Sequence, residues 1–187
     1  MKSLQIVGVL LLISFSGFGQ TLLTDPTEIS PILIGEEMPD ATLYNLEDEP
    51  ITVRELVKSK PTLFIIYRGS WCPYCNKQLA GLQMAEEAIR NLGFQIVAIS
   101  PDTPTDMRET IDNNELTYQV YSDKTTEFIT QMGLVFKDKK GRVLPVPAIY
   151  MVDTDGLVQF SYVNSNYKVR PEPELILKAA ELMKEEK

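Results

Sequence analysis

Two cysteines, separated by two residues, are the side chains of this 187-residue sequence best suited to chemistry. They lie in the run Trp71-Cys72-Pro73-Tyr74-Cys75. In the first turn of a helix, this spacing brings both sulfur atoms within bonding distance. Thiols placed in this way exchange electrons with disulfides through a mixed-disulfide intermediate. The spacing therefore predicts a redox-active pair.

The neighbouring sequence predicts where the pair lies. Residues 62–67 form a continuous apolar, β-favouring run, which is typical of a strand buried on both faces. Residues 76–92 repeat apolar side chains at helical spacing and are followed by Gly93, a natural helix end. Cys72 then falls at the helix N-terminus, where free N–H groups and the helix dipole lower a thiol pKa below its free value of ~8.5.

These positions assign different roles to the two thiols. We expect Cys72 to be the exposed, attacking sulfur and Cys75, one turn further along, to be the less exposed resolving sulfur. Pro73 suits the first helical position, and Pro73-Tyr74 places no cation between the cysteines. The alternatives are an inert disulfide, half of an intermolecular zinc site, and two reduced core cysteines. An inert disulfide would close a loop of only four residues and add little stability.

Composition excludes several other functions. Asp and Glu number 26 against 18 Lys and Arg, a net charge of −8, which argues against nucleic acid as a partner. The chain has no histidine, so Ser-His-Asp catalysis, Cys-His catalysis and His-ligated metal sites are excluded. With two cysteines, a four-cysteine zinc site cannot form within one chain. We expect neither a metal nor a cofactor.

The N-terminus resembles an export signal. Lys2 precedes the apolar stretch from Ile6 to Phe18, and Gly17-Phe18-Gly19 is a small-x-small pattern that a signal peptidase accepts. We expect a secretory signal peptide over residues 1–19, a mature chain of residues 20–187, and a periplasmic or secreted protein. The alternative is an uncleaved anchor, although the stretch is shorter than the ~20 residues of a spanning helix. No membrane span is expected in the mature chain.

Strands alternate with helices over the rest of the chain. Further strands are predicted at 41–46, 50–53, 94–100, 118–121, 148–152 and 157–163, and further helices at 105–113, 124–132 and 171–185. A helical turn is predicted at 53–57, and residues 137–142 (KDKKGR) are predicted to be a cationic, solvated loop. No linker or repeat divides the chain. The pattern predicts one α/β domain with its sheet covered on both faces.

The run from Tyr67 to Leu79 (YRGSWCPYCNKQL) resembles the alkyl hydroperoxide reductase/thiol-specific antioxidant (redoxin) branch of the thioredoxin-like superfamily. The likeness extends to residues 35–42, 96–100, 121–123 and 148–156, and it covers about residues 33 to 183. The resemblance implies a thioredoxin-like fold, with a central mixed sheet flanked by helices on both faces. It also implies that the partners are protein or small-molecule thiols and disulfides, or hydroperoxides, together with an unidentified electron donor.

The resemblance singles out four more residues. Thioredoxin-like proteins carry a cis-proline before the strand that faces the cysteines, which implies a cis Pro147 and substrate pairing with the backbone of Val146. The alternative is an ordinary trans proline that ends a loop. Trp71 resembles the tryptophan of disulfide oxidoreductases, which shields the thiolate and forms part of the docking surface; the alternative is a core tryptophan. Arg68 either stabilises the Cys72 thiolate or is a solvated surface residue.

The family contains peroxidases as well as disulfide oxidoreductases. Peroxiredoxins have a Pro-x-x-x-Thr/Ser-x-x-Cys pattern, but Ile65 and Gly69 stand at its proline and hydroxyl positions. They also have an arginine before the late strand, where this chain has Pro147, and the nearest arginine is Arg142. The resemblance therefore favours a thiol–disulfide oxidoreductase over a thiol peroxidase. A non-catalytic or copper-binding module is a weaker third interpretation, because copper chaperones of this fold use a histidine.

Overall fold

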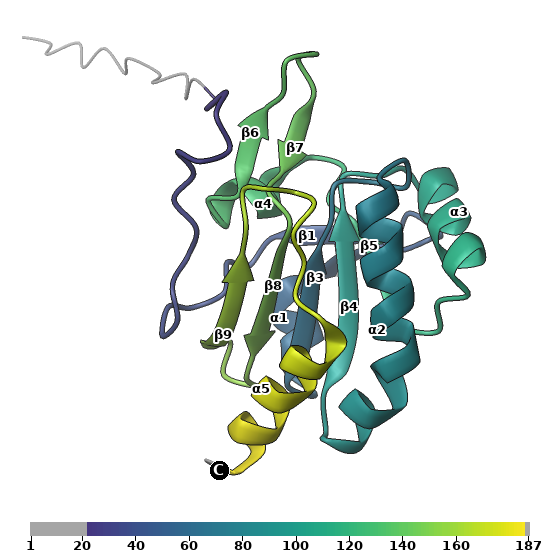
Figure 1. Cartoon of the computed structure of the whole chain (residues 1–187), viewed down its shortest axis with the longest axis vertical. Coiled ribbons are helices and arrows are strands. Elements are labelled where there is room, and N and C mark those ends of the chain that lie inside the picture. Colours follow the sequence, from purple (N-terminus) through teal and green to yellow (C-terminus); the bar gives the residue numbers. More distant parts are fainter. Residues whose placement is uncertain (1–21, 186–187) are drawn as a thin grey trace, which may run out of the picture.

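Seven strands form one sheet in the order β2-β1-β5-β4-β3-β8-β9 (Figure 1). This computed structural model describes residues 22–185, so the signal peptide predicted at residues 1–19 lies outside the described residues. Strands β3, β4 and β5 run parallel, whereas β8, β9 and β1 pair antiparallel with their neighbours. The mixed sheet agrees with the predicted fold class. The strands are β1 (Thr42–Tyr44), β2 (Pro50–Thr52), β3 (Thr62–Ile66), β4 (Gln95–Ser100), β5 (Gln119–Ser122), β8 (Ala148–Val152) and β9 (Val158–Val163).

Helices cover both faces of the sheet, which confirms the predicted layers. α2 (Pro73–Asn91), α3 (Pro104–Asn114) and α5 (Pro173–Glu185) pack on one face, and α1 (Val53–Val57) and α4 (Glu127–Gln131) pack on the other. The central strand β3 explains why two cores form. Its alternate side chains point to opposite faces, with Leu63 and Ile65 toward α2 and Phe64 and Ile66 toward α1 and α4. All four are fully buried.

Some element boundaries differ from the sequence predictions. α3 begins at Pro104, one residue before the predicted start, because Thr103 is the N-cap and forms a reciprocal capping box with Asp106. α4 is only the segment Glu127–Gln131 of the helix predicted over 124–132. The cationic loop at 137–142 joins two unpredicted strands, β6 (Val135–Lys137) and β7 (Val143–Pro145). In Figure 1 this two-stranded hairpin stands out from the upper end of the molecule.

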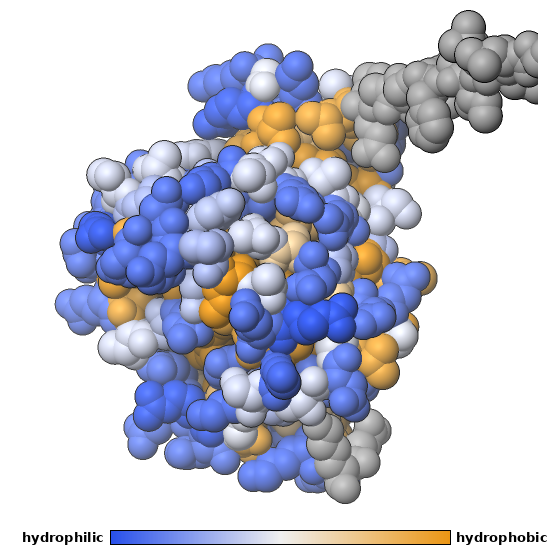
Figure 2. All heavy atoms as spheres, turned by 180° about the vertical axis from the view of Figure 1, so that it is seen from behind, coloured by the Kyte–Doolittle hydropathy of each residue, from blue (hydrophilic) through white to orange (hydrophobic). Residues whose placement is uncertain are grey.

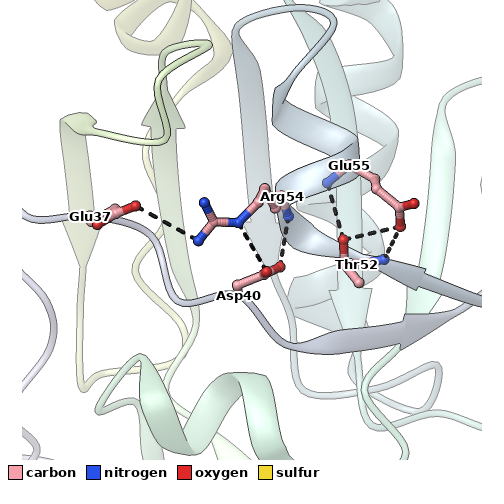
Figure 3. Close-up of polar contacts among 5 residues, drawn as sticks. All are labelled: Glu37, Asp40, Thr52, Arg54 and Glu55. Carbon is pink, nitrogen blue, oxygen red and sulfur yellow. Dashed lines mark hydrogen bonds and ion pairs between the residues drawn. The ribbon is translucent and has the colours of Figure 1, made fainter.

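The segment before β1 lies across the sheet face that carries α1 and α4. The backbone N–H groups of Ile32 and Gly35 donate hydrogen bonds to the carbonyl oxygens of Met132 and Val158, respectively. Further along, Asp40 accepts hydrogen bonds at 3.0 Å from both the backbone N–H and the side-chain Nε of Arg54, at the start of α1 (Figure 3). These exposed contacts add little stability individually, but they align the segment with the α1 capping box of Thr52 and Glu55.

Gly133 makes this close packing possible. Its φ is +66°, a conformation that side chains disfavour, and a Cβ atom there would overlap the carbonyl oxygen of Ser30. Gly93 offers a matched comparison, because its φ is +96° but a Cβ atom would have nothing within 4 Å.

We therefore expect Gly93→Ala to lower the free energy of unfolding by about 1–2 kcal/mol, the cost of the backbone conformation alone. Gly133→Ala should cost about 4 kcal/mol or more, because the Ser30 backbone must also move. Urea unfolding of both variants measures the difference. Equal losses would show that the 22–38 segment contributes nothing to the stability of the fold.

Candidate active site

The chain turns from β3 to α2 within a short loop at the upper end of the sheet (Figure 1). After Tyr67, whose N–H still bonds to Ile99 of the parallel strand β4, residues 68–71 lead to Cys72, the N-cap of α2. Two side chains hold this loop. Asp102, just after β4, accepts a hydrogen bond from the Ser70 N–H at 2.9 Å, and Asn76 donates one to the Ser70 carbonyl at 2.7 Å.

Gly69 is required in this loop. Its φ is +141°, and a Cβ atom would lie 2.6 Å from the indole nitrogen of Trp71 and 2.8 Å from a carboxylate oxygen of Asp102. A real side chain does not approach other atoms so closely. The position at which peroxiredoxins carry a hydroxyl residue is therefore filled here by the side chains of Trp71 and Asp102.

Both sulfurs are free thiols at the first turn of α2. Pro73 occupies the N1 position as predicted, and the N-cap side chain makes no hydrogen bond to the helix N–H groups. Both cysteine residues have no exposed surface, so the expected exposure of Cys72 is wrong. The reason is packing, because Cys72 and Cys75 belong to the core between α2 and the sheet, together with Tyr67 and Leu79.

The pKa values of the two thiols are shifted in opposite directions. A hydrogen bond from the Cys75 thiol is the largest cause that lowers the pKa of Cys72, to about 6; burial opposes it, and the Cys75 N–H, Arg68 and Arg170 add to it. The same hydrogen bond, burial and the charge of Cys72 raise the pKa of Cys75 far above its usual value. One sulfur is therefore a thiolate at neutral pH, while the other keeps its proton.

Aromatic rings and guanidinium groups surround the start of α2. Arg68 is 9% exposed, and its guanidinium carbon lies 4.9 Å from the ring centre of Trp71 and 4.3 Å from that of Tyr167. It is thus not the solvated surface residue that was one alternative. The rings of Tyr74 and Tyr167 pack edge to face, with 5.8 Å between the ring centres. Trp71 is 46% exposed, which argues against a core tryptophan.

Two more arginines come from distant parts of the chain, one to Trp71 and one to Cys75. The guanidinium carbon of Arg142, in the turn just before β7, lies 4.4 Å from the Trp71 ring centre. Arg170, between β9 and α5, places Nη2 3.7 Å from the Cys75 sulfur. Within residues 22–185, neither Arg68 nor Arg170 has a carboxylate within ion-pair distance. Both positive charges therefore act on the sulfur pair without local compensation.

The structure differs from the sequence expectations at Val146 and Pro147. No cis peptide bond occurs within residues 22–185, so the cis assignment of Pro147 is wrong; trans is the more stable form of an X–Pro bond. The Val146 N–H donates to the Leu134 carbonyl at 2.8 Å, which occupies the donor that was expected to pair with a substrate. Both residues are buried, immediately before β8.

Asp102, Tyr167 and Arg170 are residues near the site that were not predicted from the sequence. The position of Asp102 was predictable, because an acidic residue directly after a strand parallel to β3 must lie at the same sheet edge as Cys72. The positions of Arg170 and Tyr167 were not, because they lie in an irregular segment about a hundred positions from the cysteines. Within residues 22–185, no group of three or more Cys, Asp or Glu side chains could hold a metal ion.

A groove begins beside the pair and runs between α2 and the start of α5. Its volume is about 710 Å³, and its walls include Tyr74, Gln78, Met84, Arg170 and Leu177. The Gln78 side-chain oxygen and the Arg170 Nε are buried without hydrogen-bond partners. Both atoms belong to residues that line the groove, but the atoms themselves have no exposed surface.

Similar proteins include both chemistries of the family. The AhpC/TSA family model matches residues 34–161. Thiol-disulfide oxidoreductase ResA of Bacillus thuringiensis is 27% identical over 152 residues, which cover 80% of this chain and 82% of that protein. Chloroplastic peroxiredoxin Q of Gentiana triflora is 28% identical over 130 residues, or 70% of this chain and 58% of that protein.

Solved structures agree on the fold. Reduced Prx3 from Vibrio vulnificus superimposes with a TM-score of 0.74 at 21% identity, covering 80% of this chain and 99% of that one. Peroxidoxin BcpB from Mycobacterium tuberculosis gives a TM-score of 0.70 at 17% identity, covering 80% and 97%. The sheet, the position of the paired cysteines and the family match agree: this chain is a thioredoxin-fold member of the AhpC/TSA family and a redox enzyme.

Proposed function

We propose that the protein is an exported thiol–disulfide oxidoreductase that acts through Cys72 and Cys75. The observation that carries this proposal is the unequal acidity of the two neighbouring thiols, one with a pKa of about 6 and one held protonated. A nucleophile and a resolving thiol within one helical turn suit disulfide exchange. Export rests on the apolar N-terminal segment within residues 1–19, with residues 20–187 as the mature domain.

The first step transfers the partner onto the protein. The Cys72 thiolate attacks a sulfur of the partner's disulfide, a new S–S bond forms to Cys72, and the displaced partner sulfur leaves as a thiolate. Trp71, exposed beside the pair, is the proposed contact surface for the partner. Val146 and Pro147 are buried, so the proposed surface does not include them. Pro73, Tyr74 and Arg68 hold the thiolate at the helix start.

The second step releases the partner. Once Cys72 is in a mixed disulfide, its charge and its hydrogen bond with Cys75 are lost, so two causes that raise the Cys75 pKa disappear. Cys75 then loses its proton to solvent, helped by the Arg170 guanidinium. Its thiolate attacks the Cys72 sulfur, the S–S bond between Cys72 and the partner breaks, and the partner leaves as a thiolate that takes a proton from solvent. The protein ends as a disulfide, the partner is reduced, and an electron donor of unknown identity restores the dithiol.

A thiol peroxidase is the second candidate. The low Cys72 pKa and the nearby Arg68 would also favour attack on a hydroperoxide. The similarity to peroxiredoxin Q supports the same interpretation. The crowding at Gly69 argues against it, because the hydroxyl side chain that peroxiredoxins place there has no room in this loop.

Stopped-flow fluorescence of Trp71, the chain's only tryptophan, separates the two candidates. We expect the reduced protein to react with a model disulfide at least tenfold faster than a free thiol at the same pH, since thiolate fraction governs exchange. Hydrogen peroxide should react no faster with Cys72 than with a free thiolate. Rapid peroxide oxidation with slow disulfide exchange would replace this proposal with the peroxidase.

Alkylation of Cys72 by iodoacetamide should follow its ionisation. The rate should rise as pH increases through about 6 and level off above 7, because the reactive thiolate replaces the thiol over that interval. Cys75→Ala should shift the midpoint to higher pH, because it removes the hydrogen bond that lowers the pKa most. Cys75→Ser, which keeps a hydroxyl donor, should shift it less. A wild-type midpoint near the free value of ~8.5 would contradict the assignment.

Arg170→Gln should slow the release of the mixed disulfide about tenfold and move the pH profile of that step upward, because the Cys75 thiolate loses its cation. Arg170→Lys should restore part of the rate, and Lys168→Gln, an exposed neighbour, serves as the control. Cys75→Ser, which traps the mixed disulfide, and Cys72→Ser, which forms none, set the limits of the assay. Equal rates in Arg170→Gln and wild type would remove this role of Arg170.

A further inference from the structure

The β6–β7 hairpin carries the strongest local positive charge of the described residues, in a chain whose net charge is −8. Its turn, residues 137–142, has four cations and one anion among six residues. Lys137, Lys139, Lys140 and Arg142 are all exposed. In Figure 2, which shows the molecule from behind, the outer end of this projection is a hydrophilic cap above an apolar band.

The single anion of the turn is used inside the hairpin. Asp138 accepts hydrogen bonds from the Lys140 and Arg142 N–H groups, each at 2.9 Å, and pairs with the Arg142 guanidinium at 2.7 Å. Among the described residues, none of the three lysines has a carboxylate within ion-pair distance. The outward charge of the turn is therefore that of its three lysines.

Arg142 joins the hairpin to the redox pair. Its guanidinium stacks on Trp71, which directly precedes Cys72, and Arg68 lies against the same ring. Exposed lysines on a hairpin commonly do no more than keep its edges solvated. Here Arg142 links the charged turn to Trp71, the residue before Cys72, so the turn lies on the side of the molecule that carries the redox pair and its field acts on an approaching partner.

We propose that the β6–β7 hairpin, residues 135–145, is a docking arm for an acidic segment flanking the reactive disulfide of a partner protein. This inference rests on the proposed function and names the partner class. The lysines attract the acidic segment, and Arg142 on Trp71 fixes where the arm stands relative to Cys72. A partner protein fits better than a small anionic disulfide, because the arm projects away from the body of the molecule (Figure 1).

Three disulfides of different charge test the arm. One is a symmetric disulfide of a cysteine peptide flanked by Asp and Glu, the second is the same peptide with Lys at those positions, and the third is uncharged 2-hydroxyethyl disulfide. The reduced protein should react with the acidic peptide at least tenfold faster than with the basic one at low ionic strength, and the difference should shrink as salt screens the charges.

Lys139→Glu/Lys140→Glu should lower the rate with the acidic peptide about tenfold and leave the rate with 2-hydroxyethyl disulfide unchanged. Lys58→Glu/Lys60→Glu is the matched control, because it reverses two exposed lysines at the other end of β3. This control should keep the preference of the wild type for the acidic peptide. Equal rates with both peptides, or equal losses in the two variants, would overturn the docking arm.

Binding without chemistry separates the arm from the proposed function. The acidic peptide with its cysteine replaced by serine should quench or shift Trp71 fluorescence, and Lys139→Glu/Lys140→Glu should abolish this change. If 2-hydroxyethyl disulfide does not react but the serine peptide binds, the proposed disulfide exchange is wrong, while binding of acidic segments by the hairpin is supported. If the serine peptide does not bind, while the protein sediments with vesicles of anionic phospholipid, the arm contacts membranes and the proposal is wrong.

Discussion

Only one of the two buried sulfur atoms at the start of α2 is ionised, because a second negative charge in this water-poor position would be strongly unfavourable. The proton stays on Cys75, which donates it in a hydrogen bond to Cys72. The site therefore has a built-in order of events. Cys75 can ionise readily only after Cys72 has given up its charge to a new bond, so the two proposed steps follow one another without a histidine to move protons.

The loop between β3 and α2 sets the position of this pair. Gly69 gives the backbone a conformation closed to other residues, and the space beside it is filled by the Trp71 indole and the Asp102 carboxylate. The same interactions support the proposed disulfide exchange over peroxide reduction. A loop that has room for a tryptophan at the helix start has none for the hydroxyl side chain that peroxiredoxins place three residues before their cysteine.

Local sequence patterns were sufficient for the fold and for the core of the site. The apolar run 62–67 and the helical repeat at 76–92 correctly predicted β3 and most of α2, because burial and periodicity act over a few residues. Burial of Cys72 was not predictable, since it depends on packing between α2 and the sheet. Arg142, in the β6–β7 hairpin, contacts Trp71, and Arg170, in the segment after β9, contacts Cys75; no local pattern encodes contacts across that distance.

The complete burial of Cys72 changes what its reaction rate measures. A sulfur without exposed surface can meet a partner only during brief openings of the side chains packed over it. The observed rate is then the intrinsic rate of the thiolate multiplied by the fraction of time that the site is open. Packing over Cys72 thus acts as a second control on reactivity, independent of acidity, and a substitution that only loosens this packing would speed the enzyme without altering either sulfur.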